Sequence, residues 1–173
     1  MGDSTLSSVG RGRSKKRVFV GLVTHLAALA FGFALGIYLL PILTAPDSPD
    51  AAVLESLAKT AMYEGDFTMD LDGSDLFHWG TGRIYLSNDS LVHQGELAPG
   101  PDYMAYLVPS FVTNEEEFLK IKDQSRSLGS VKTFQGFMLP INEPIDFTRY
   151  RAVVIWCEAF GEFITAATLR PLK

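Results

Sequence analysis

The sequence predicts an all-β domain, an antiparallel β-sandwich, preceded by a single transmembrane helix and a short amphipathic helix. First, residues 18–43 form one apolar run without a formal charge. Second, the chain from residue 64 onward consists of short β-branched and aromatic segments separated by Gly, Pro, Asn and Asp. Such a texture is typical of sandwiches and barrels. Third, the charged residues are segregated, which divides the chain into parts of different character.

The 173-residue chain has a formal net charge of −5, and this value is the sum of three parts with different charges. Residues 1–17 hold five basic residues and one acidic residue, residues 18–45 hold no charge, and the remainder holds ten basic and nineteen acidic residues. An acidic body with scattered basic residues does not attract phosphates, so we expect no nucleic-acid partner. One cysteine excludes an internal disulfide framework and a cysteine-rich zinc module.

Residues 18–43 are expected to cross a membrane as an uncleaved helix. At 1.5 Å per residue the run would be about 39 Å long, whereas a bilayer core is roughly 30 Å thick. A signal peptide has a shorter apolar region and a small residue at the third position before cleavage, where this chain has Leu43. The basic tail before the span and Asp47 and Asp50 after it predict a cytoplasmic amino terminus and an extracytoplasmic body at the cell membrane.

One side of the predicted span is lined with small residues. Gly32 and Gly36 form a GxxxG pair, which permits close approach of a second helix, and His25 falls on the same side. The pattern is compatible with self-association or with pairing to another membrane helix. It is equally compatible with the ordinary abundance of Gly and Ala in membrane spans.

The remaining organisation follows from composition. Residues 1–17 are assigned as a basic cytoplasmic tail, 18–43 as the transmembrane helix, 44–62 as a stalk and short helix, and 63–173 as the extracytoplasmic β-domain. The stalk has two prolines, and residues 51–63 place apolar side chains at helical spacing. This amphipathic helix is expected either to lie on the membrane surface or to pack on the body.

Seven strands are predicted in the body, at residues 80–87, 90–97, 103–110, 118–122, 133–140, 150–157 and 162–169. In the sixth of these, Ala152, Val154 and Trp156 point to one side while Val153, Ile155 and Cys157 point to the other. Because both sets are apolar, this strand is predicted to be central and covered on both faces, with Cys157 at its end.

Four blocks of the sequence resemble the DM-thirteen domain family, which is described as an electron-transfer domain. The blocks are FHWGTGRIY at residues 77–85, GPD at 100–102, LG at 128–129 with Gly136 beyond, and YRAVVIWC at 150–157 followed by AATL at 166–169. The resemblance implies a small all-β fold of sandwich type. It also implies that Cys157 is an almost constant cysteine linked to redox chemistry.

Cys157 is therefore the candidate catalytic residue. A thiol can carry oxidising equivalents as a sulfenic acid, as a mixed disulfide or as a metal-bound thiolate. Because the chain has no second cysteine, any disulfide must form with another molecule, an unidentified protein redox partner. Burial and the neighbouring Glu158 would both disfavour the thiolate. The competing interpretation is a buried, unreactive cysteine in a non-catalytic binding or structural module, which displays loops around residues 100–102 and 129–136.

Other candidate sites carry weaker signals. His78 and His93 could join Cys157 in a copper-like set, with Met104 or Met138, but no ligand pair has a diagnostic spacing. In GPD, Asp102 is expected to cap a turn through its carboxylate. Residues 115–117 are interpreted as a solvated charge run. The sequence names no cofactor, and no hydrolase or kinase constellation occurs, so a stand-alone enzyme is not expected.

Overall fold

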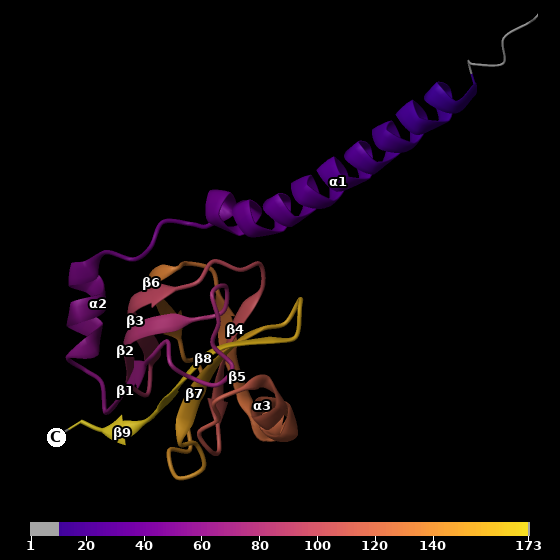
Figure 1. Ribbon diagram of the computed structural model, residues 1–173. Helices are drawn as coiled ribbons and strands as arrows, with labels where there is room; N and C mark the ends of the chain where they lie inside the picture. The colour runs from indigo at the N-terminus through magenta and orange to yellow at the C-terminus, as the bar shows by residue number, and fades with distance from the viewer. Residues whose placement is uncertain (1–10, 173) are drawn as a thin grey trace, which may run out of the picture. The chain divides into compact units, whose positions relative to one another are not determined.

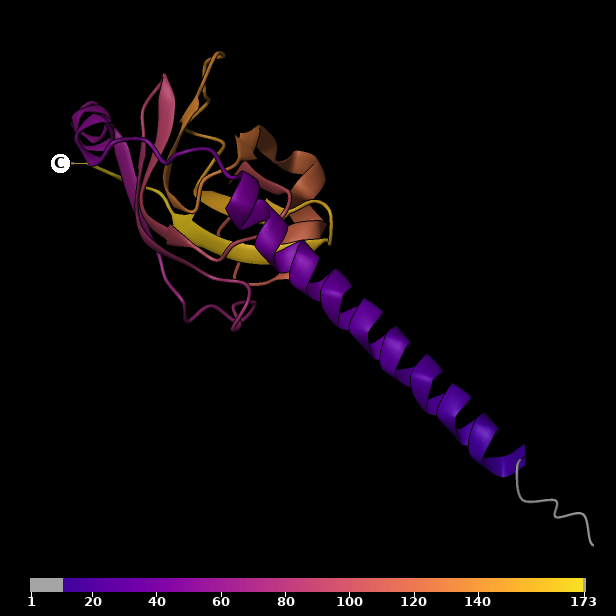
Figure 2. The same cartoon turned by 90° about the horizontal axis from the view of Figure 1, so that it is seen from above.

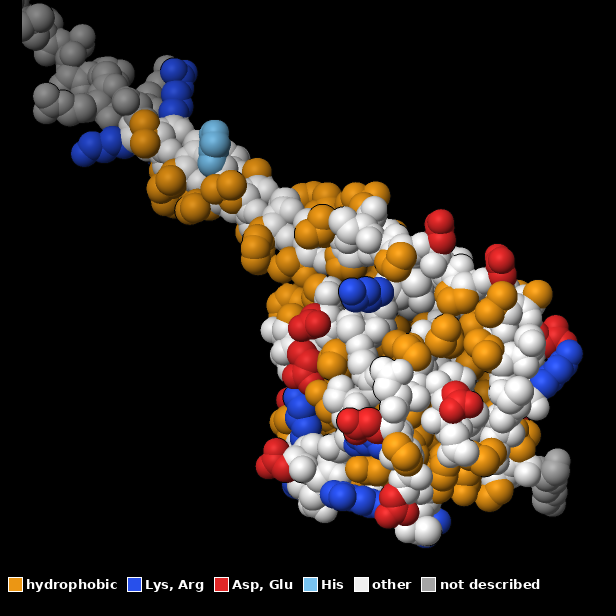
Figure 3. Space-filling model, turned by 180° about the vertical axis from the view of Figure 1, so that it is seen from behind, with side chains coloured by type: hydrophobic (Ala, Val, Ile, Leu, Met, Phe, Trp, Pro, Cys, Tyr) orange, Lys and Arg blue, Asp and Glu red, His pale blue; other side chains and the backbone are white. Residues whose placement is uncertain are grey.

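The computed structural model describes residues 11–172, with side chains from Lys15 onward, and divides the chain into two compact units at residues 39 and 40. The first element is the helix α1 (Arg11–Thr44), and the stretch Lys15–Thr44 contains an 18-residue window with a mean hydropathy of 2.3. This stretch is long and apolar enough to cross a membrane. Its apolar side chains are exposed along the helix, as Figure 3 shows.

The body is a sandwich of two antiparallel sheets, which confirms the predicted fold class (Figure 1). Sheet A has the strand order β6-β3-β2-β1-β9, and sheet B has the order β5-β4-β7-β8. The strands of sheet A are β1 (Tyr63–Phe67), β2 (Gly80–Leu86), β3 (Ser90–Leu97), β6 (Gln135–Pro140) and β9 (Arg170–Pro171). Those of sheet B are β4 (Tyr103–Val108), β5 (Arg126–Val131), β7 (Ala152–Cys157) and β8 (Glu162–Thr168). Figure 2 shows the same two layers from above.

Strand β7 is the central element of the body, and both of its faces are buried. Val153, Ile155 and Cys157 lie in the core between the two sheets. Ala152 and Trp156 belong to a second core on the outer face of sheet B. The predicted double burial of this strand is therefore confirmed, as is the position of Cys157 at its end.

The second core is closed by a helix, where the sequence analysis predicted a strand at residues 118–122. That prediction is wrong: Glu115–Ile121 forms the helix α3, followed by a 3-10 turn, η1 (Lys122–Gln124). The side chain of Asn114 caps α3 by accepting a hydrogen bond from the Glu117 N–H at 3.0 Å. Three glutamates in the first turn suit the positive end of a helix. Phe118 is fully buried against sheet B.

Three strands were not predicted, the two-residue β9 and the longer β1 and β5, and both of the longer ones contain glycine. In β1, a Cβ at Gly65 would lie 2.6 Å from the Thr168 carbonyl oxygen, so glycine allows the backbones to approach closely. In β5, Gly129 has a φ of 133° at a register shift opposite β4. Glycine lowers strand propensity, and this explains why neither segment was recognised from composition.

The short helix predicted after the stalk is α2 (Ala51–Ala58), and it packs on the body. Leu54 is its buried residue, and a Cβ at Gly136 of β6 would lie 2.9 Å from a Leu54 methyl carbon. Gly136, with a φ of 79°, therefore provides the space for this contact. Of the two expected locations of the helix, the structure shows the one on the body.

Candidate functional site

Cys157 ends β7 inside the sandwich. Cys157 is 3% exposed, and in the strand register it lies opposite Tyr103 of β4 on one side and Glu162 of β8 on the other. Beyond Cys157 the chain turns back into β8, and the Gly161 N–H donates to the Cys157 carbonyl at 2.9 Å. Gly161 has a φ of 69°, which favours glycine in this tight turn. The thiol is thus held between a strand end and a turn.

The GPD segment at residues 100–102 packs directly against this turn. The Asp102 carbonyl accepts a hydrogen bond from the Glu158 N–H at 2.9 Å, and the Asp102 N–H faces the Cys157 sulfur. Gly100 lies against the ring of Tyr103, where a Cβ would collide with the phenol. Asp102 therefore contributes two backbone groups to this contact.

Three backbone N–H groups, those of Phe160, Asp102 and Ala159, face the Cys157 sulfur. Burial is the largest influence and raises the pKa of the thiol, while these three N–H groups oppose the increase because they stabilise a thiolate. The negative charge of Asp102 adds to the increase. The net pKa is above its ordinary value, so the resting group at neutral pH is the protonated thiol.

Glu158, the next residue, points away from the thiol into a cluster on the outer face of sheet B. Its carboxylate accepts hydrogen bonds from the Tyr106 hydroxyl and from Lys122 Nζ, the latter at 2.7 Å. Burial raises the pKa of Glu158, but these two donors outweigh burial and hold the pKa below its usual range. Burial and the Glu158 carboxylate raise the pKa of Tyr106. The negative charge that raises the pKa of the Cys157 thiol is therefore that of Asp102, where the sequence analysis expected that of Glu158.

Aromatic rings complete this cluster. The Trp156 and Phe118 ring centroids are 4.9 Å apart, and those of Phe118 and Tyr106 are 5.4 Å apart. Lys122 Nζ lies 5.2 Å from the centroid of the Trp156 ring and 5.7 Å from that of Tyr106. Lys122 therefore joins η1 to strands β4 and β7 through both charge and cation–π contacts.

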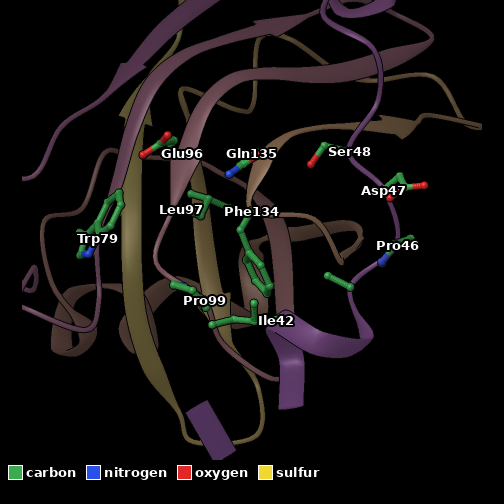
Figure 4. Close-up of a pocket in the computed structure, with 11 residues that line it drawn as sticks. Ile42, Pro46, Asp47, Ser48, Trp79, Glu96, Leu97, Pro99, Phe134 and Gln135 are labelled. Atoms are coloured by element: carbon green, nitrogen blue, oxygen red, sulfur yellow. The ribbon is translucent and has the colours of Figure 1, made fainter. Parts of the chain in front are cut away.

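Two cavities lie near the GPD segment. One, of about 260 Å³, is bordered by residues 100–102 together with Ser130, Val131, Lys132 and Phe134. The other, of about 470 Å³, places Trp79 on one wall and Phe134 on another, with Glu96 and Gln135 at its rim (Figure 4). Phe134 lines both cavities, and its ring meets the ring of Tyr103 edge-on, with the two centroids 6.1 Å apart.

The proposed copper-like set is not assembled. His93 is fully buried within sheet A, between Phe67 and Phe137, and its Nε2 lies 2.9 Å from the Thr81 carbonyl. His78 lies in an exposed loop, with Nδ1 3.0 Å from Asp75. Among residues 11–172 no group of three His, Cys, Asp or Glu side chains is arranged to hold a metal ion.

The body is thus an all-β sandwich with a buried cysteine beside the GPD segment. A model of the family described as "Electron transfer DM13" matches residues 71–169, more than half of the chain. The chain therefore belongs to the DM13 electron-transfer family, and the resemblance noted from the four sequence blocks is confirmed. Neither the curated proteins nor the solved structures contain a significant match.

Sequence reasoning missed Tyr106 and Lys122. They come from β4 and η1, and only the fold brings them to Glu158. The one signal available was the position of Glu158 directly after Cys157.

Proposed function

We propose that this chain is a membrane-anchored electron-transfer module that acts through Cys157. The observation that carries the proposal is the set of three backbone N–H groups facing the sulfur of the chain's one cysteine, within a domain of the electron-transfer family. Donors in this arrangement stabilise negative charge as it develops on sulfur. They act only after the thiol loses its proton.

The chemistry proposed is thiol–disulfide exchange with an outside partner. The Cys157 thiol releases its proton to solvent, and the thiolate attacks one sulfur of a partner disulfide. A new S–S bond forms, the partner S–S bond breaks, and the second partner sulfur leaves as a thiolate. Cys157 is then oxidised and the partner is half reduced. Because the thiol is buried, the turn at residues 158–161 must open for this contact.

The test is thiol reactivity in the full chain held in detergent micelles. We expect Cys157 to form a mixed disulfide with an oxidised glutathione probe, and to become labelled by dimedone after mild peroxide treatment. Cys157→Ser should abolish both products. A thiol that stays unlabelled in the native chain, yet reacts fully in denaturant, would contradict the redox function.

The second candidate function is a non-catalytic binding module. It is favoured by the cavity of about 260 Å³ shared between residues 100–102 and the loop that contains Lys132 and Phe134. We expect Phe134→Ala to abolish binding of a physiological partner while Cys157→Ser leaves binding intact. Loss of binding in folded Cys157→Ser, with no loss in Phe134→Ala, would reject this function.

We also propose that α1 anchors the chain in the cell membrane with its amino terminus cytoplasmic and its body outside. The support is the apolar stretch of α1 and the basic residues that precede it. Protease added to intact cells should degrade a tag placed after the body but spare a tag at the amino terminus. Degradation of the amino-terminal tag alone would reverse the orientation.

Within the span, we propose that Gly32 and Gly36 form a contact with a second membrane helix. A Cβ at either glycine meets no described atom within 4 Å, so this face has room for a partner backbone. Gly36→Leu should weaken crosslinking between spans in native membranes, and unchanged crosslinking would reject the contact.

A further inference from the structure

Glu158 links the two faces of sheet B through two different parts of one residue. Its backbone N–H bonds to the Asp102 carbonyl beside the thiol, at 2.9 Å. Its carboxylate, on the other side, receives Tyr106 and Lys122. Any displacement of Glu158 is therefore transmitted to the turn that it begins.

This carboxylate contact is partly shielded from water. The side chains of Lys122 and Glu158 are 28% and 30% exposed, whereas those of Lys120 and Glu116, an ion pair of the same 2.7 Å length on α3, are 65% and 83% exposed. A half-buried pair with an additional hydroxyl donor is worth more than an exposed pair, because solvent competes less for its charges. The pair of Lys122 and Glu158 is therefore expected to be the stronger one, and the pair of Lys120 and Glu116 the weaker one.

The cluster is unsuited to carrying electrons itself. Lys122 Nζ lies over the rings of both Trp156 and Tyr106, and a positive charge at that distance disfavours the loss of an electron from either ring. Its geometry instead restrains position. It binds η1, β4 and β7 to the residue that starts the turn around Cys157.

We propose that Glu158, Tyr106 and Lys122 are positioning residues for Cys157: together they hold the turn at residues 158–161 so that its backbone N–H groups face the sulfur. This inference rests on the proposed function of Cys157. The three residues do not touch the sulfur; they act through the Ala159 and Phe160 N–H groups. Breaking the cluster should move those donors away and make the thiolate harder to form.

Other charged groups near the thiol are accounted for. Asp102, from the loop before β4, faces the sulfur and raises the pKa of the thiol. Glu162 lies opposite Cys157 in the β7–β8 register. Both remain unchanged in the variants below, so they contribute equally to every titration.

The experiment uses the full chain in detergent micelles, labelled with ¹³C at the Cβ of its one cysteine. The resonance reports the thiol pKa directly during a pH titration. Glu158→Ala should raise that pKa by about one unit, because loss of one charge-stabilised hydrogen bond is of that order. Tyr106→Phe, which removes only a hydroxyl, should raise it by less. The matched control is Glu116→Ala, which breaks the exposed pair on α3 and should leave the pKa unchanged.

Amide hydrogen exchange provides the second readout. In folded Glu158→Ala we expect the Ala159 and Phe160 amides to exchange about tenfold faster, with no change in Glu116→Ala. If Glu158→Ala does not fold, Tyr106→Phe decides both measurements. A thiol pKa that stays constant or falls in the variants would overturn the proposal.

The failure of this inference can be told from failure of the redox function. If the wild-type thiol reacts with the oxidised probe but its pKa is unchanged in Glu158→Ala, only the positioning role is rejected. A thiol whose pKa responds to Glu158, but which never reacts in the native chain, supports the positioning role and rejects the redox function.

Discussion

The outer face of sheet B and the β2-β1-β9 part of the outer face of sheet A are built in opposite ways. On sheet A, Glu64 and Asp66 of β1 form ion pairs with Arg83 and Arg170 across neighbouring strands, at the surface. On sheet B, the outer face is apolar and covered by α3, and the half-buried ion pair of Lys122 and Glu158 lies at the end of β7, next to Cys157. A substitution on the exposed ionic face should disturb few neighbours, whereas a substitution on the covered face should displace the residues packed against it. The cysteine lies in the sheet that is restrained from both sides.

The largest expected effect comes from truncating the covered face. Trp156→Ala removes a large, fully buried side chain that packs on Phe118, so it should lower the free energy of unfolding by about 3–5 kcal/mol. Chemical denaturation followed by circular dichroism measures this. A loss below about 1 kcal/mol would show that α3 collapses onto the vacated space and that the covered face is less restrictive than its packing indicates.

The inner face of sheet A has its own sensitivity, to acid. Burial lowers the pKa of His93 to about 4, and within residues 11–172 its Nδ1 has no hydrogen-bond partner. The unfolded chain therefore binds a proton that the folded chain rejects, so stability falls as the pH decreases from about 6.5 towards 4. The loss reaches about 3 kcal/mol.

This acid sensitivity is tested by denaturation at a series of pH values. His93→Gln keeps an amide N–H for the Thr81 carbonyl but cannot titrate, so its stability should depend less on pH across that interval. An identical slope in the variant would assign the acid sensitivity to other groups.

A smaller effect is expected at the GPD segment. Gly100→Ala places a methyl group against the ring of Tyr103, and relief of the overlap should cost about 1–3 kcal/mol. Thermal unfolding measures the cost. If the variant is as stable as the parent, the segment moves freely and does not restrain the turn beside Cys157.

The smallest effect is expected on the open face of sheet A. Arg170→Ala removes the exposed contacts to Glu64 and Asp66, which bury little and are screened by salt. Any loss of stability at low salt should disappear in 1 M salt. A loss that persists in salt would mean that the open face contributes packing as well as charge.

The predictable parts of this molecule were those that follow from local pattern. Both alternating sets of side chains in residues 152–157 are apolar, and this predicted a strand that is buried on both faces. Turn residues on either side of residues 90–97 predicted β3 with its observed ends. The helix α3 was missed because Phe118 and the residues after it have strand-like composition, while the capping role of Asn114 depends on its conformation. Tyr106 and Lys122 could not be assigned to Cys157, because their shared partner, Glu158, is brought to them only by the pairing of β4 with β7 and the packing of η1.

The position of the first strand of the body has a mechanical consequence. Tyr63 begins β1, which is hydrogen-bonded to β2 on one side and to β9 on the other, and the Leu172 N–H donates to the Met62 carbonyl at 2.9 Å. The hydrogen bonds of an antiparallel ladder run perpendicular to its strands. A pull along the axis of β1 would therefore load its bonds to β2 in shear, together, whereas a pull on the two-residue strand β9 would load only its short pairing with β1. Strand β1 is therefore held most firmly against a force directed along its own axis.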